Sequence, residues 1–177
     1  MEKSSKSHAV NYGIYLSLIL VLFTVLAYAF KIELLVNFWL TLLLLPVIII
    51  AFGVVSSAKA KSLSGGFINF KNAFTAYLIP VAIGLILNTI VAIVIFNFVD
   101  PDSADYLKEL VISKSQAFME SVGAPQSEID KSIATMQEQD TFAIGTQLRS
   151  LAQSFIFFIV IGLIVGLIMK KKDPNAA

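Results

Sequence analysis

The chain has 177 residues, of which 57% are hydrophobic and 14% are charged, whereas soluble domains average about 45–50% apolar and about 25% charged residues. One soluble core cannot bury this excess, so the composition indicates an integral membrane protein. A formal net charge of +1 and the absence of cysteine exclude a basic nucleic-acid-binding domain, a disulfide-stabilised scaffold and thiol catalysis.

Four apolar segments are each long enough to cross a bilayer core of about 30 Å as a helix. In chain order they are residues 10–30, 34–56, 72–98 and 151–169. None has an acidic or basic side chain in its interior or a period-2 alternation, and a helix satisfies its own backbone hydrogen bonds in hydrocarbon. We therefore predict an all-α membrane protein with four transmembrane helices.

The start of the chain has a second interpretation. Lys3 and Lys6 precede an apolar stretch that ends in Ala27-Tyr28-Ala29, which is a pattern typical of a cleaved signal peptide. The apolar run is long for a signal peptide, and residues 31–33 are typical of a turn into the next span. We favour a retained first span.

The connection at residues 100–141 is the only sizeable polar segment. Asp100 can cap a first helix, and a second helix would place Ile129, Ile133 and Met136 on one face. The sequence therefore predicts a helical hairpin. The complete organisation is a tail at residues 1–9, spans one to three within 10–99, the hairpin at 100–141, span four within 142–170 and a tail at 171–177.

The distribution of charge predicts the orientation. Lys59, Lys61 and Lys71 lie in the second loop without an acid, and both termini are rich in lysine, whereas residues 100–150 carry nine carboxylates against four basic residues. Basic loops stay on the cytoplasmic side. We expect both termini to be cytoplasmic and the acidic hairpin to be extracytoplasmic.

Three short segments carry a family resemblance: residues 66–74 (GFINFKNAF), residues 96–101 (FNFVDP) with the acidic helical segment after them, and residues 168–172 (IMKKK). Together they resemble the domain-of-unknown-function family forty-one ninety-nine, small four-span inner-membrane proteins found mostly in Bacteroidota. The resemblance covers nearly the whole chain. It implies a bacterial inner membrane and a periplasmic hairpin, but no activity, because the family has none assigned.

Asn88, near the middle of the third span, is the most buried polar candidate. A polar side chain in hydrocarbon needs a partner. Asn88 could donate to the Leu42 carbonyl, which Pro46 leaves free, or to Ser17 or Thr24 of the first span. A contact that holds helices together is the plainer interpretation, and a polar point on a solute path is the alternative.

A polar layer is predicted where the spans meet the hairpin. Its members are Asn37, Thr41, Asn97, Gln147, Arg149 and Gln153. Arg149 could reach the headgroups or pair with Asp100, Asp102 or Asp105. Anchoring or docking of the hairpin is favoured, and a binding cleft that faces the periplasm is the alternative.

Small and aromatic residues predict how the helices pack. Gly162 and Gly166 form a GxxxG motif, which favours packing within the bundle over homodimerisation. Pro80 should kink the third span and leave the Ala76 carbonyl free. Tyr77 is assigned to the interfacial aromatic belt at the cytoplasmic side.

Sequence motifs of catalysis are lacking. The only histidine, His8, lies in the polar tail, and the sequence has no nucleophile elbow, phosphate-binding glycine loop or intramembrane carboxylate pair. We expect no catalytic, metal or cofactor site and no nucleic-acid partner. The favoured function is an accessory or scaffold subunit of an inner-membrane complex, contacting lipid and a protein partner or a second copy. The alternative is a small oligomeric transporter or channel component.

Overall fold

The computed structural model describes residues 3–172, and within them it confirms an all-helical membrane protein. The helices that are long and apolar enough to span a bilayer are Ser5–Phe30, Leu40–Leu63, Phe70–Val99 and Ile144–Met169. They correspond to α1 (Lys3–Phe30), η2 with α2 (Leu40–Leu44 and Leu45–Leu63), α3 with η3 (Phe70–Val94 and Ile95–Val99) and α6 (Ile144–Met169). The chain is therefore a multi-pass membrane protein.

Three helix starts differ from the predicted spans by more than two residues. The first helix begins at Lys3 and the last at Ile144, both before the predicted starts, because helices continue into polar sequence beyond the apolar core. The second span begins later than predicted, at Leu40, because Ile32–Val36 forms a separate 3₁₀ turn, η1. Apolar content predicts which part of a helix lies in hydrocarbon, but it does not predict the residue at which the helix starts.

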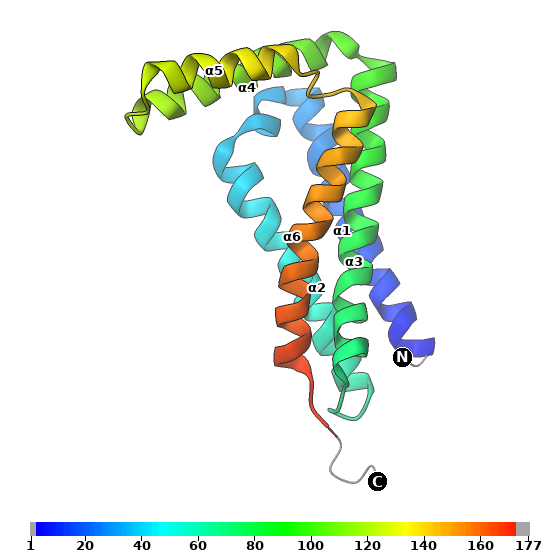
Figure 1. Ribbon diagram of the computed structural model, residues 1–177. Coiled ribbons are helices and arrows are strands. Elements are labelled where there is room, and N and C mark those ends of the chain that lie inside the picture. The colour runs from blue at the N-terminus through cyan, green and yellow to red at the C-terminus, as the bar shows by residue number, and fades with distance from the viewer. Residues whose placement is uncertain (1–2, 173–177) are drawn as a thin grey trace.

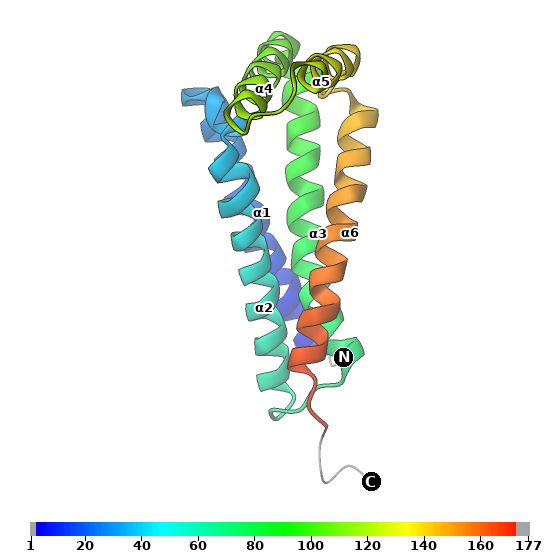
Figure 2. The ribbon, with the colours of Figure 1, turned by 60° about the vertical axis from the view of Figure 1, so that its left-hand side comes forward.

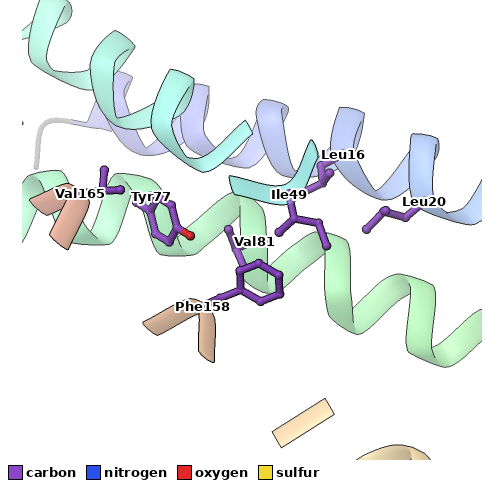
Figure 3. Packing of buried hydrophobic residues seen from close by; sticks show 7 residues of the cluster. All are labelled: Leu16, Leu20, Ile49, Tyr77, Val81, Phe158 and Val165. Carbon is purple, nitrogen blue, oxygen red and sulfur yellow. The ribbon is translucent and has the colours of Figure 1, made fainter. Parts of the chain in front are cut away.

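Helix α3 lies at the centre of the bundle and contacts α1, α2 and α6 (Figures 1 and 2). Seven buried side chains from all four helices form the main core: Leu16, Leu20, Ile49, Tyr77, Val81, Phe158 and Val165 (Figure 3). The outward faces of the same helices carry exposed Leu, Ile, Val and Phe. Apolar residues on all sides are what a bilayer requires of a spanning helix.

The bundle has two distinct ends. Helix α1 starts, α6 finishes and the α2–α3 loop turns at one end, which we call the terminal end; the opposite end is the hairpin end (Figure 1). At the terminal end the Lys171 N–H donates to the Ile68 carbonyl at 2.8 Å, and the Ile68 N–H donates back at 3.0 Å. This bridge ties the residues after α6 to the α2–α3 loop.

Two serines join α2 to α3. The Ser56 hydroxyl donates to the Ala76 carbonyl at 2.7 Å, and the Ser57 hydroxyl donates to the Ala73 carbonyl at 3.0 Å. Pro80 has no N–H to offer Ala76, so the carbonyl that the sequence left free is satisfied by the neighbouring helix. Both serines are buried.

The hairpin consists of α4 (Pro101–Ser121) and α5 (Gln126–Glu138). Gly123, with φ +75°, supplies the left-handed residue in the turn between them. The two helices lie across the hairpin end and extend sideways beyond the bundle, on the side of α2 (Figure 1). Ile129 of α5 is buried, and Ile133 and Met136 are half-buried, as the predicted apolar face requires.

Candidate functional site

The predicted polar residue of the third span has a partner on α1. The Thr24 hydroxyl donates to Asn88 Oδ1 at 2.8 Å. Ser17 instead bonds the Ile14 carbonyl of its own helix. Asn88 is half-buried and Thr24 is buried, so the pair links α1 to α3 in the hairpin half of the bundle.

Asn88 bonds to Thr24 and not to the Leu42 carbonyl that the sequence also offered. Leu40–Leu44, just before Pro46, is a π-helical turn in which the Leu45 N–H donates to the Leu40 carbonyl. A π-turn shifts the hydrogen-bond register by one residue, which is a known way to accommodate a proline in a spanning helix. The backbone therefore adjusts locally at this position.

Two cavities meet at Asn88. One, of about 190 Å³, lies between α1, α3 and the start of the second span, with Thr24 and Thr41 in its walls. The other, of about 280 Å³, lies between α3 and α6. The second cavity has six polar lining residues: Asn88, Thr89, Thr141, Gln147, Ser150 and Ser154. Asn88 and Phe96 line both cavities, so Asn88 places a polar side chain in two cavities whose wall surface is otherwise largely apolar.

Asn97 and Gln147 converge on one backbone carbonyl. Asn97 Nδ2 donates to Phe142 O at 3.0 Å, and Gln147 Nε2 donates to the same oxygen at 2.7 Å. The Phe142 ring packs against Phe96 with centroids 5.2 Å apart. The segment between α5 and α6 is therefore fixed to η3 and to the first turn of α6.

The other members of the predicted polar layer lie apart from this pair. Asn37 Oδ1 accepts from the backbone N–H groups of Trp39 and Leu40 at 3.1 and 3.2 Å, which caps the start of the second span. Arg149 and Gln153 are exposed on α6. The Thr41 hydroxyl donates to the Asn37 carbonyl at 2.8 Å. The six residues therefore do not form one layer: two lie at the start of the second span, two share the Phe142 carbonyl and two are exposed on α6.

Asp100, one of the predicted partners of Arg149, forms hydrogen bonds with other residues. Asp100 Oδ2 accepts from the Tyr28 hydroxyl at 2.9 Å and from the Ser103 hydroxyl at 2.6 Å, and Oδ1 accepts from the Ser103 N–H at 3.1 Å. Among residues 3–172, Arg149 makes no ion pair. Asp100 caps α4 as predicted and also ties it to α1.

A second contact, between the hairpin and the turn η1 that joins the first two spans, was not predicted from the sequence. The Tyr106 hydroxyl donates to Glu33 Oε1 at 3.1 Å. The pKa of Glu33 is lowered by its own backbone N–H and then by Tyr106, and the pKa of Tyr106 is raised by this bond. The sequence separation of 73 residues leaves no local signal that could have predicted the pair.

The two glycines of α6 pack inside the bundle. A Cβ atom at Gly162 would lie 2.7 Å from Tyr77 Cδ1, and one at Gly166 would lie 3.0 Å from Phe70 Cε2. Gly53 of α2 approaches the opposite edge of the Tyr77 ring, where a Cβ would lie 2.5 Å from Cδ2 and Cε2. Tyr77 is 0% exposed, so its assignment to the interfacial belt was wrong: glycines on two neighbouring helices enclose it.

The chemistry available at these positions is hydrogen bonding and packing. Within residues 3–172, no group of three or more His, Asp or Glu side chains is placed to hold a metal ion. Across the same residues, the buried side-chain atoms that lack a hydrogen-bond partner are Ser5 Oγ and the Tyr77 hydroxyl. The cavities around Asn88 and the hairpin are the features that a function could use.

Comparison with known proteins gives one match. Residues 11–171 match the model of a family described as Protein of unknown function (DUF4199). Neither a curated protein nor a solved structure matches the chain significantly. The family match covers both the four spanning helices and the hairpin, so the chain belongs to this family of proteins of unknown function.

Proposed function

We propose that the protein is a non-enzymatic accessory or scaffold subunit of a bacterial inner-membrane complex. The observation that carries the proposal is a hairpin that is anchored to the spans and carries many solvent-exposed carboxylates. Those carboxylates belong to Asp102, Asp105, Glu109, Glu120, Glu128, Asp130 and Glu138. An acidic surface held in a fixed position suits the recognition of a basic partner.

The anchoring consists of several independent contacts. Asp100 bonds Tyr28, and Tyr106 bonds Glu33. Ala104 and Leu107 of α4 are buried in one cluster with Ile95 and Phe96 of η3. An arm held at several points costs a partner little ordering entropy on binding, which supports a docking role.

The proposed orientation places the hairpin in the periplasm and both termini in the cytoplasm. Lys59 and Lys61 lie on the last turns of α2 at the terminal end, and Lys170–Lys172 follow α6 at the same end. Lysines gathered at one end of the spans favour the cytoplasm for that end. The carboxylates gather at the other end.

The spans offer a second contact surface. Helix α6 turns Gly162 and Gly166 toward α3 and leaves Ile156, Ile164 and Ile168 53–72% exposed on its outward face. Lipid covers such a face in an isolated bundle, and partner helices can replace that lipid. We propose that helices of the partner pack along this face while its periplasmic part contacts the hairpin.

The test is purification from the native host in a mild detergent, with co-purifying proteins quantified. In one variant, Glu128→Gln, Asp130→Asn and Glu138→Gln neutralise three exposed carboxylates of α5 together. The matched control is Lys131→Gln, which removes the opposite charge from the same helix. We expect a stoichiometric partner to be lost from the triple variant and at raised ionic strength, and retained by the control. A homo-oligomer without a partner would contradict the proposal. So would a partner that the triple variant retains and that stays bound at raised ionic strength.

A second candidate function, a small oligomeric transporter or channel component, is supported by the two cavities that meet at the polar side chain of Asn88. Its test is proton and potassium flux into liposomes that contain the full-length protein. If Asn88 lies on a solute path, Asn88→Leu abolishes flux at unchanged protein level. Flux that is absent from the parent protein, or that persists in the variant, would contradict this role.

A further inference from the structure

A cavity of about 490 Å³ lies beneath the hairpin. Its walls include Leu35, Val36 and Phe38, before the second span, and Val111, Phe118 and Met136 on the hairpin. The Phe38 and Phe118 rings stack with centroids 5.3 Å apart. The volume falls in the range of about 300–1,000 Å³ that is typical of ligand sites.

The cavity lies at the level of the membrane interface. Phe38 is followed by Trp39, which is 69% exposed and packs edge-on against it at 5.8 Å. Tryptophan gathers at the boundary between headgroups and hydrocarbon. Leu42, on the next turn, is 57% exposed on the surface that faces lipid. The cavity wall is therefore continuous with the lipid-facing surface of the second span.

One cation and one hydroxyl stand among these apolar walls. Lys114 and Ser115 both line the cavity. Lys114 interrupts the apolar stripe of α4 and is exposed. Within the described part of the chain it makes no ion pair or hydrogen bond, although its charge contributes to lowering the pKa of Glu33. Lys114 brings an ammonium group and Ser115 a hydroxyl to the same cavity, and both groups can donate hydrogen bonds to phosphate oxygens.

We propose that this cavity binds one phospholipid from the leaflet at the hairpin end. One acyl chain lies between Phe38 and the underside of the hairpin, and the lipid phosphate lies at Lys114 and Ser115. A bound lipid would fill the space beneath the overhanging hairpin and join it to the bilayer. The site differs from the exposed carboxylates assigned to a protein partner, so each assignment can fail alone.

The first experiment uses the full-length protein in nanodiscs of phosphatidylethanolamine and phosphatidylglycerol. A trace of phosphatidylethanolamine carries a diazirine on one acyl chain, and cross-linked peptides are mapped by mass spectrometry after illumination. We expect cross-links on Phe118 and Met136. Ser115→Trp, which places a bulky ring in the cavity wall, should reduce them several-fold, while cross-links to α6 stay unchanged as the internal reference.

The matched control for that variant is Ser113→Trp, at an exposed position outside the cavity. It should leave the cross-links on Phe118 and Met136 unchanged. Absence of these cross-links from the parent protein, or an equal loss in both tryptophan variants, would overturn the proposal.

The second experiment distinguishes lipid binding from any effect of the bulky tryptophan on folding. Lys114→Gln preserves the shape of the cavity wall and removes the charge, and Lys131→Gln removes a lysine elsewhere on the hairpin. Native mass spectrometry of detergent-purified protein should show one retained phospholipid, released about tenfold more readily from Lys114→Gln only. Equal retention by both variants, or retention of a fatty acid in place of a phospholipid, would overturn the assignment.

Discussion

At the scale of single residues, the core is built around one tyrosine ring. Tyr77 lies between Gly53 of α2 and Gly162 of α6, so α3 approaches both helices at the depth where they lack side chains. Small residues allow such close approach, which drives packing between helices in a bilayer. The GxxxG motif of α6 therefore serves the bundle's own core.

Gly53→Ala tests this packing. The added methyl would lie 2.5 Å from the Tyr77 ring, and we expect a destabilisation of about 1–3 kcal/mol from overpacking. Gly145→Ala is the control, because nothing lies within 4 Å of its Cβ position; it should be neutral or stabilising by up to about 1 kcal/mol. Unfolding of both variants in mixed micelles gives the comparison. Equal changes in the stability of the two variants would mean that the Tyr77 ring moves at little cost to accommodate the methyl group.

Ser56→Ala and Ser57→Ala test the proline of α3. Ser56 donates to the Ala76 carbonyl, which receives no backbone hydrogen bond from Pro80 because proline has no N–H. Ser57 donates to the Ala73 carbonyl, and the N–H of Tyr77, four residues further on, is also available to that carbonyl. We expect Ser56→Ala to cost about 1–3 kcal/mol, since it leaves a buried carbonyl unsatisfied, and Ser57→Ala to cost less than about 1 kcal/mol. The same unfolding assay measures both. An inverted order would show that the Ala76 carbonyl finds another donor.

At the scale of elements, α4 is held to the spans by its first turn. The pKa of Asp100 is lowered by the Ser103 hydroxyl and N–H and then by the Tyr28 hydroxyl. Glu33 has its pKa lowered as well, by its own backbone N–H and by Tyr106. Both carboxylates accept hydrogen bonds in their charged form. We therefore expect the docking of the hairpin to weaken at acid pH.

The sign of this coupling follows from the direction of the shifts. A carboxylate whose pKa is lower in the folded state contributes stability above its unfolded pKa, and that contribution is lost as the pH falls through the folded pKa. We expect amide exchange in the first turn of α4 to rise, relative to α3, as the pH drops below the ordinary aspartate range. Asp100→Asn should exchange faster at neutral pH and lose most of this dependence. A flat profile in the parent protein would contradict the coupling.

At the scale of the whole molecule, the hairpin and the start of α1 lie at opposite ends of the bundle (Figure 1). The chain has no cysteine, so single cysteines can report which side of the membrane each end faces. Ser127 on α5 and Ser62 near the end of α2 are both exposed serines. They form a matched pair at the two ends.

We expect Ser127→Cys to react with a membrane-impermeant maleimide once the outer membrane is opened, and Ser62→Cys to react only after the inner membrane is lysed. The reason is the concentration of lysine at the terminal end. Gel shift of the labelled protein measures both. The reverse pattern would place the hairpin in the cytoplasm and remove the basis for a periplasmic partner.

The sequence by itself determined which segments lie in the membrane. A run of about 20 apolar residues has no stable place in water, and in lipid it must be helical, so the four spans needed no tertiary information. The cap at Asp100 was also local, because a cap is an interaction between residues close in sequence. For Asn88 the sequence offered three possible partners, the Leu42 carbonyl, Ser17 and Thr24, and for the free Ala76 carbonyl it offered none.

Only the tertiary structure decided which residues meet. Thr24 bonds Asn88, Ser56 bonds Ala76 and Tyr106 bonds Glu33 because helix rotation and tilt bring these faces together. Tyr77 illustrates the limit: an aromatic residue near a span end fits an interfacial belt equally well until Gly53 and Gly162 are seen to enclose it. In a chain whose helices are apolar all round, hydrophobicity fixes the depth of a residue in the bilayer. It cannot fix the direction in which that residue faces, since lipid and core are alike to an apolar side chain.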